Sequence, residues 1–131
     1  MKKVVIHGQL PDLNTDIGLI RSHPMAYSNH KRDWTDFVKM SVFNKVKIPN
    51  EYYPLILVFY WFTKDKKMDC DNVAFAKKYI LDGLKEAKII PDDSRKYIAG
   101  LGGDFFEVDK NDPRVEVAFI PEELFPIPRI Q

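Results

Sequence analysis

The sequence predicts a small α+β (mixed α/β) domain over residues 1–131, with a mixed sheet of about four strands and two main helices. The first observation is the run LILVFYWF at 55–62, which has the length of a buried strand. The second is a helical period of apolar residues from Asp71 to about Lys88. The third is the alternation of apolar and polar residues over 115–120, which is typical of a strand with one buried face.

Composition fits a folded domain and gives only weak support for a nucleic-acid partner. Hydrophobic residues make up 45% of the chain and the formal net charge is +1, whereas DNA-binding domains usually display a basic surface. No apolar run has the length of a membrane span, and the N-terminus leads directly into a strand pattern without a signal peptide. The single cysteine, Cys70, fits a reducing compartment. We therefore expect a cytoplasmic protein with no membrane partner.

The first half of the chain predicts one strand and one long helix. Residues 3–7 read as the strand, and residues 8–14 are rich in turn formers. Propensity is mixed over 17–28, where Pro24 interrupts, so this segment stays ambiguous. Residues 30–46 predict a helix, with one apolar face made of Trp34, Phe37, Val38 and Val42.

The second half predicts the rest of the sheet, with residues 55–62 as its central strand. The other elements are, in order, a connector at 49–54, a polar loop at 63–68, a strand beginning at 96–100, a turn at 102–104, a resumed strand at 105–108, a turn at 111–113, a final strand at 115–120 and an extended tail.

The helix after the polar loop has two distinct faces. Its apolar stripe, which we expect to face the core, consists of Val73, Ala76, Ile80, Leu84 and Ala87. The opposite face carries Asp71, Phe75, Lys78 and Asp82 at spacings of four, three and four. One interpretation is purely structural: Asp71 or Asn72 caps the helix start, and Lys78 with Asp82 forms an ordinary surface pair.

The combination of motifs supports a second interpretation. Asp69-x-Asp71-Asn72 precedes a helix with a lysine on the acid's face, followed by Leu-Asp-Gly-Leu and then Ile-Ile-Pro-Asp-Asp. This pattern, over residues 69–94, resembles the RusA family of Holliday junction resolvases, and most closely its phage and prophage-type members. The resemblance implies metal binding by Asp69, Asp71 and Asp93.

The resemblance also implies roles for neighbouring residues. Lys78 matches the catalytic lysine when aligned from Asp82, with Lys77 beside it, but it lies seven residues after Asp71 where the family usually has four. Four and seven share a helical face, so the role can move by one turn. Supporting positions around the ligands match Asn72, Asp82 and Asp92. The residues expected near DNA are Lys66, Lys67, Lys77 and Asn14, although Asn14 also reads as a turn residue bonding its own backbone.

The function that the resemblance implies is a Mg²⁺-dependent endonuclease of DNA recombination and repair, which resolves four-way junctions by paired symmetric cuts. Carboxylates that hold Mg²⁺ suit this chemistry, since the ion activates water and stabilises phosphoryl charge. A homodimer matches the two-fold symmetry of the junction. Two alternatives remain: a protein that binds branched DNA without cutting it, and a phage accessory protein whose dimer serves assembly.

Helix geometry adds a constraint on the metal site. Asp82 lies about 16 Å along the axis from Asp71, and the helix end near Lys88 lies about 25 Å away. Five further residues to Asp93 span at most about 17 Å. We therefore predict that Asp93 meets Asp69 and Asp71 of a partner subunit across a two-fold axis. The alternative is a helix that begins later or breaks at Gly83.

Overall fold

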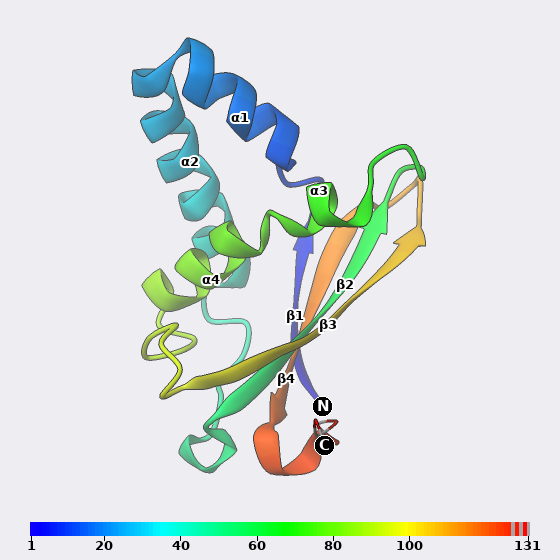
Figure 1. Ribbon diagram of the computed structural model, residues 1–131. Coiled ribbons are helices and arrows are strands. Elements are labelled where there is room, and N and C mark those ends of the chain that lie inside the picture. The colour runs from blue at the N-terminus through cyan, green and yellow to red at the C-terminus, as the bar shows by residue number, and fades with distance from the viewer. Residues whose placement is uncertain (127, 129, 131) are drawn as a thin grey trace.

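The computed structural model describes residues 1–126, 128 and 130, and it has the predicted α+β class. Its single mixed sheet contains β1 (Lys2–His7), β2 (Leu55–Thr63), β3 (Ile98–Val108) and β4 (Arg114–Pro121). The strand order is β1-β4-β2-β3, so β2 is an inner strand, as predicted. Strand β2 runs parallel to β3 and antiparallel to β4, and β4 is antiparallel to β1 (Figure 1).

Helices α1 (Leu13–Ser22), α2 (Pro24–Val42) and α4 (Lys77–Glu86) lie on one side of this twisted sheet, and the short α3 (Cys70–Ala74) lies near the end of β2 (Figure 1). Two 3₁₀ turns complete the described elements, at Asn50–Tyr52 and Glu122–Leu124. Among the helices of the described residues, none combines the length and the apolar character needed to cross a membrane.

The main core lies between the sheet and the helices. Alternate side chains of β2 point into it, because successive residues of a strand face opposite sides of a sheet. Leu55, Leu57 and Phe59 are fully buried there, against α2 and α4. The predicted stripe of the 71–88 segment faces this core: Ala76, Ile80 and Leu84 are buried, and Val73 and Ala87 pack at its margin. Each fully buried Leu or Ile contributes about 2 kcal/mol of transfer free energy.

Helices α2 and α4 approach each other closely at Gly83. A Cβ built there would lie 2.4 Å from Cγ1 of Val38, so only glycine fits without displacing α2. This contact explains the glycine within an otherwise strong helical pattern, where it costs about 1 kcal/mol relative to alanine. The sequence left two alternatives to one long helix. The break at Gly83 is wrong because α4 continues through it, whereas the later start is confirmed, since α4 begins at Lys77.

The single helix predicted from Asp71 to about Lys88 is wrong, because the segment forms two helices that meet at Phe75 and Ala76. Backbone hydrogen bonds at the junction span three residues, from Ala76 to Val73 and from Tyr79 to Ala76. Such bonds tighten the turn and change the helix direction. Tertiary packing sets the two axes, since α3 lies against α1 and α4 against α2. The sequence offers neither proline nor glycine at the junction.

The helix predicted at 30–46 also has different bounds. Helix α2 starts at Pro24, whose fixed φ suits a first helical position, and it ends at Val42 before Asn44 adopts a positive φ of 58°. Residues 13–22, mostly within the ambiguous segment, form α1. Lys31 and Arg32 therefore lie inside α2 and not at its start, and Arg32 pairs with Glu86 of α4 at 2.7 Å.

The turn predicted at 102–104 is wrong, since β3 continues from Ile98 to Val108. Its pairing with β2 shifts register twice, and these irregularities absorb the glycines without ending the strand. Gly102 is needed for packing, because a Cβ there would lie 2.6 Å from Ile56 and 2.8 Å from Phe125. The extended tail predicted after residue 120 is wrong in its first part, because Pro121 ends β4 and Glu122–Leu124 form a 3₁₀ turn. The remainder lies partly outside the described residues.

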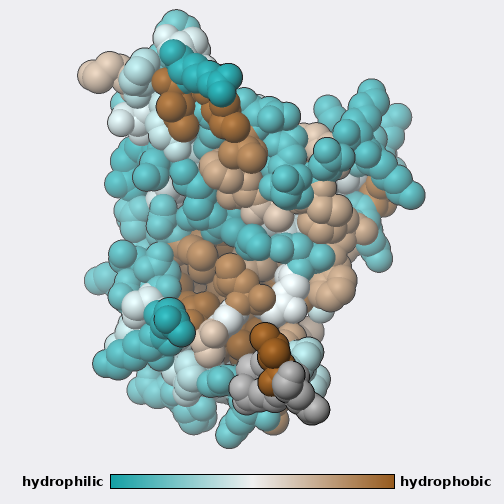
Figure 2. Space-filling view, viewed as in Figure 1, coloured by the Kyte–Doolittle hydropathy of each residue, from teal (hydrophilic) through white to brown (hydrophobic). Residues whose placement is uncertain are grey.

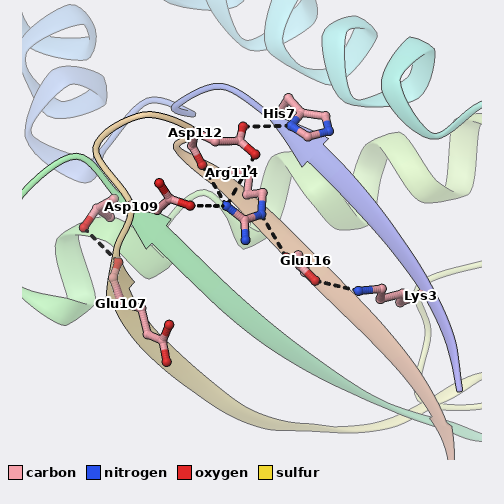
Figure 3. Close-up of polar contacts among 8 residues, drawn as sticks. Lys3, His7, Glu107, Asp109, Asp112, Arg114 and Glu116 are labelled. Carbon is pink, nitrogen blue, oxygen red and sulfur yellow. Dashed lines mark hydrogen bonds and ion pairs between the residues drawn. The ribbon is translucent and has the colours of Figure 1, made fainter.

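The face of the sheet away from the helices has an apolar part and a charged part. Ile56, Val58 and Ala118 are buried in the apolar part, against Phe125. In the charged part, the Arg114 guanidinium forms ion pairs with the carboxylates of Asp109 at 2.8 Å and Glu116 at 2.9 Å (Figure 3). Lys3 of β1 forms a further ion pair with Glu116. Lys3 first, and then Arg114, lower the pKa of Glu116. Asp109 and Glu116 are therefore neutralised by basic side chains of the same chain.

Candidate functional site

An exposed acid pair opens α3, where the polar loop from β2 ends. Asp69 occupies the N-cap position with extended backbone, yet its side chain makes no capping hydrogen bond. Asp71 lies in the first turn, and its carboxylate accepts the backbone N–H of Asn72 at 2.9 Å. Neither acid therefore caps the helix in the usual way. Within the described residues, the Asp69 carboxylate has no hydrogen bond or ion pair, so its oxygens are free for a ligand.

A cleft lies beside this acid pair, between the polar loop and the end of β3. Its volume is about 330 Å³, and its lining residues are Thr63, Asp65, Lys66, Met68, Asp69, Cys70, Val73, Phe106, Glu107 and Val108. Lys66 and Lys67 are exposed on the loop, which forms a hydrophilic projection at one end of the molecule (Figure 2). Cys70 is free and exposed between the two acids. The cleft thus brings three carboxylates, those of Asp65, Asp69 and Glu107, together with one lysine, Lys66.

Asn72 ties the acid pair to the start of α1. Its side-chain oxygen accepts the backbone N–H of Asn14 at 3.1 Å. Asn14 is in the first turn of α1 and not in the loop that the sequence predicts, because Asp12 caps α1 by accepting the N–H of Thr15 at 2.8 Å. The sequence reasoning therefore placed Asn14 and Asn72 in one neighbourhood, and the structure joins them directly. Their contact positions the N-terminal end of α3 against α1.

The side chain of Lys78, on α4, reaches Tyr27 of α2 and lies among aromatic rings. Its ammonium donates to the Tyr27 hydroxyl at 2.9 Å and lies 5.1 Å from the Phe75 ring centroid and 5.3 Å from that of Tyr79. Rings hold a cation by their negative faces and fix its position. In the part of the chain described here, Lys78 forms no ion pair with Asp69 or Asp71. Phe75, which lies four residues after Asp71, is thus one of the aromatic rings around the Lys78 ammonium.

Lys77 is engaged on the other side of α4. Its ammonium lies 2.6 Å from the carboxylate of Asp104 on β3, which also accepts the indole N–H of Trp61 at 2.9 Å. Both Lys77 and Asp104 are largely buried, so this ion pair attaches α4 to the sheet. Lys77 therefore differs from Lys66 and Lys67, whose ammonium groups face solvent.

A buried polar cluster that the sequence reasoning missed lies behind Lys78. Asp16 of α1 is fully buried, and its carboxylate accepts hydrogen bonds from the Tyr79 hydroxyl and from Nε2 of His30, the latter at 3.0 Å. Burial first, and then Asp16, raise the pKa of Tyr79 well above its ordinary value. The only local signal was an acid at the fourth position after Asp12, which reads equally well as a favourable charge in a first helical turn.

The second group of acids lies beyond the opposite end of α4. Asp93 is exposed in the turn before β3, and Asp92 pairs with Lys85 at 3.5 Å. The backbone amide of Asp93, and less strongly Ser94 and Lys85, lower the pKa of Asp92. Asp82 lines a separate cleft of about 320 Å³ between α2 and α4, with Lys31 and Arg32. Figure 1 shows α3 and the turn before β3 at opposite ends of α4.

One chain therefore does not gather the three predicted ligands. Among the described residues, no three His, Cys, Asp or Glu side chains are placed to hold a common metal ion. What one chain does offer is two exposed carboxylates at the start of α3, of which Asp69 lines the cleft. Oxygen donors of this kind suit Mg²⁺, which usually takes one or two carboxylates and keeps several waters. The donor set at Asp69 and Asp71 thus fits the ion in chemistry, with room for a further ligand.

Comparison with known proteins adds nothing to the resemblance, which rests on the motif at residues 69–94. No family model matches the chain. No curated protein matches it either.

Proposed function

We propose that the protein is a Mg²⁺-dependent endonuclease that cuts branched DNA, and in particular resolves four-way junctions by paired symmetric cuts. The observation that carries the proposal is the exposed acid pair at the start of α3, in which Asp69 lines the loop cleft and makes no capping hydrogen bond. Asp69 and Asp71 are two residues apart and like-charged, so a cation bound by both would relieve their repulsion. The sequence motif around them supports the same reading.

The acids would hold the metal, and their neighbours would keep them in place. Asp69 and Asp71 are the ligands from α3, and Asn72 fixes the orientation of Asp71 through its backbone N–H. When bound, Mg²⁺ would activate a water and stabilise charge on the phosphoryl oxygens. Lys66 and Lys67 face solvent next to the acids, where they would contact flanking phosphates. The role of Lys78 near the scissile phosphate remains a proposal from the motif.

The separation of Asp93 from the acid pair favours a homodimer. With α4 between them in one chain, a second copy is the simplest source of the third carboxylate. A two-fold dimer would then carry two equivalent metal sites, which matches two symmetric cuts in a junction that is itself two-fold. Each site would be incomplete in a monomer. We propose that this dimer acts in the cytoplasm, where Cys70 stays reduced.

The experiment is cleavage of a synthetic four-way junction and of a linear duplex with the same arm sequences, each with and without Mg²⁺. We expect paired nicks in the junction that require Mg²⁺, and little cutting of the duplex. Equal cutting of both would reduce the proposal to a general nuclease. Tight junction binding without any cutting, at every Mg²⁺ concentration, would favour the non-cleaving DNA-binding alternative.

A further inference from the structure

The free edge of β3 is unusual for the edge of a sheet. In the described part of the chain, β3 pairs with β2 alone, and its eleven residues, IAGLGGDFFEV, contain no lysine, arginine or proline. Leu101, Phe105 and Val108 are exposed at 48%, 54% and 45%. Natural edge strands are normally short, bulged or protected by such residues, because a long apolar edge pairs with other chains. The two register shifts of β3 lie before Gly103, so residues 103–108 form a regular edge. The opposite edge, β1, is only six residues long and begins with two lysines.

The two ends of β3 lie at the two halves of the acid set. Its first residue, Ile98, donates its N–H to Ser94 at 2.9 Å, so the turn that carries Asp93 leads directly into the strand. Its last residues, Phe106 to Val108, line the cleft beside Asp69. The strand thus spans the distance between Asp93 and the acid pair. Two antiparallel copies would bring the start of one strand next to the end of the other.

Charges at the ends of β3 favour an antiparallel arrangement of two copies. Just before the strand, the exposed bases Arg95 and Lys96 outnumber the exposed acid Asp93, whereas Glu107 is the exposed charge among the last residues of the strand. Parallel strands would place like charges together, and antiparallel strands place opposite charges together, which is the favourable arrangement. Figure 2 shows apolar side chains between these ends, along the region of β3. The edge therefore has an apolar middle and complementary ends, as an isologous contact requires.

We propose that a second copy of this chain pairs antiparallel with β3 along its free edge, which extends the sheet across a two-fold axis and brings Asp93 of each copy to Asp69 and Asp71 of the other. The pairing itself stands on the edge strand, and the use of the assembled acids rests on the proposed function. Backbone hydrogen bonds would join the two sheets, with the apolar side chains packed between them.

Sedimentation equilibrium over nanomolar to micromolar concentrations tests the edge. We expect a wild-type dimer and at least a tenfold weaker dimer for Leu101→Lys, since a lysine blocks edge pairing. Met40→Lys is the matched control, because Met40 is 72% exposed on α2, away from β3, and its dimer should match the wild type. A wild-type chain that stays monomeric at about 100 μM, or a dimer that Leu101→Lys leaves unchanged, overturns the proposal.

Cross-linking tests the direction of the strands in a Cys70→Ser background. Ala99→Cys and Glu107→Cys place thiols at exposed positions near the two ends of β3. A short bismaleimide should join the two variants when they are mixed, and neither variant to itself. Self-linking without mixed products would contradict the antiparallel arrangement. A dimer that passes both tests but cuts no junction would support the β3 interface and contradict the nuclease. A Leu101→Lys variant that still dimerises and cuts junctions as the wild type does would support the nuclease and contradict the β3 interface.

Discussion

Two sets of acidic residues in this molecule differ in what surrounds their oxygens. Asp16 is fully buried, and both of its carboxylate oxygens accept hydrogen bonds from protein donors, one from Tyr79 and one from His30. Asp69 and Asp71 are exposed, and within the described part of the chain only the Asp71 carboxylate accepts a hydrogen bond, from the backbone N–H of Asn72. An acid whose oxygens are occupied holds the fold together. An acid with free oxygens beside a cleft is available for a ligand.

The difference predicts opposite responses to mutation. Removing a donor from Asp16 leaves a buried carboxylate underbonded, which costs stability and should affect function only through the fold. Neutralising Asp71 removes a charge from an exposed pair, which should cost function and leave the fold intact. Each prediction below tests one side of this contrast, and they run from the largest expected effect to the smallest.

The largest effect is expected on cleavage in Asp71→Asn. Even residues that only orient a metal ligand cost about 10- to 100-fold when changed, so losing a ligand should lower the rate of junction cutting by at least about 100-fold. Far-UV circular dichroism and junction binding should be unchanged. Single-turnover cleavage under saturating protein makes the measurement. A variant that still cuts at close to the wild-type rate would remove Asp71 from the metal site.

The largest effect on stability is expected in Tyr79→Phe. The change removes one donor to the buried Asp16 carboxylate and keeps the ring, so the free energy of unfolding should fall by about 2 kcal/mol. Tyr27→Phe is the matched control, since the Tyr27 hydroxyl accepts from Lys78 at a half-buried site and makes no contact with Asp16 among the described hydrogen bonds, so its loss should cost less. Urea unfolding gives both values. Equal losses of unfolding free energy in the two variants would mean that the Tyr79 bond to Asp16 stabilises the fold no more than the Lys78 bond to Tyr27.

Alkaline pH should weaken the same cluster. The pKa of Tyr79 is raised in the folded state, so its contribution to stability is complete below the unfolded value of about 10 and is lost as the pH rises above it. In that range, the unfolding of the wild type releases one proton, so its free energy of unfolding falls by about 1.4 kcal/mol per pH unit from this group. Tyr79→Phe should lack this increment in urea unfolding between pH 9 and 11. Parallel curves for the two proteins would contradict the assignment.

The smallest effect is expected on the stability of Asp69→Asn without metal. An exposed side chain with no bond in the described residues should change the free energy of unfolding by no more than about 0.5 kcal/mol, and in the favourable direction because it relieves repulsion from Asp71. Thermal unfolding in chelator measures it. A loss above about 1 kcal/mol would show that Asp69 supports the fold after all.

Much of the sheet was predictable from the sequence, because strand patterns there are local. The runs at 3–7, 55–62 and 115–120 fall within β1, β2 and β4. The bounds of the helices were harder to predict from the sequence. The break at Ala76 comes from α3 and α4 packing on different partners, and the continuity of β3 through its glycines comes from pairing with β2. Both depend on contacts between distant segments, which local propensity does not contain.

The candidate site divides in the same way. The exposed acids are recognisable because they lie two residues apart in a motif. The sequence also placed Asn14 near the site, but its contact with Asn72 joins segments 58 residues apart and is seen only in the structure. The cluster of Asp16, His30 and Tyr79 was not recognisable, since its members lie on three different helices and none has unusual neighbours. Pairing of Lys77 with Asp104 also needed the fold, because it joins α4 to an edge strand.

The most direct measurement is complementation between Asp71→Asn and Asp93→Asn, refolded together at equal amounts and assayed for Mg²⁺-dependent junction nicking. If each site takes Asp71 from one chain and Asp93 from the other, random pairing leaves about a quarter of the sites intact and activity returns in the mixture. Asp69→Asn mixed with Asp71→Asn is the control and should stay inactive, because each of its sites carries one lesion. We predict activity near a quarter of wild type in the first mixture. An inactive first mixture, beside an active wild type treated in the same way, would contradict a site shared between two copies.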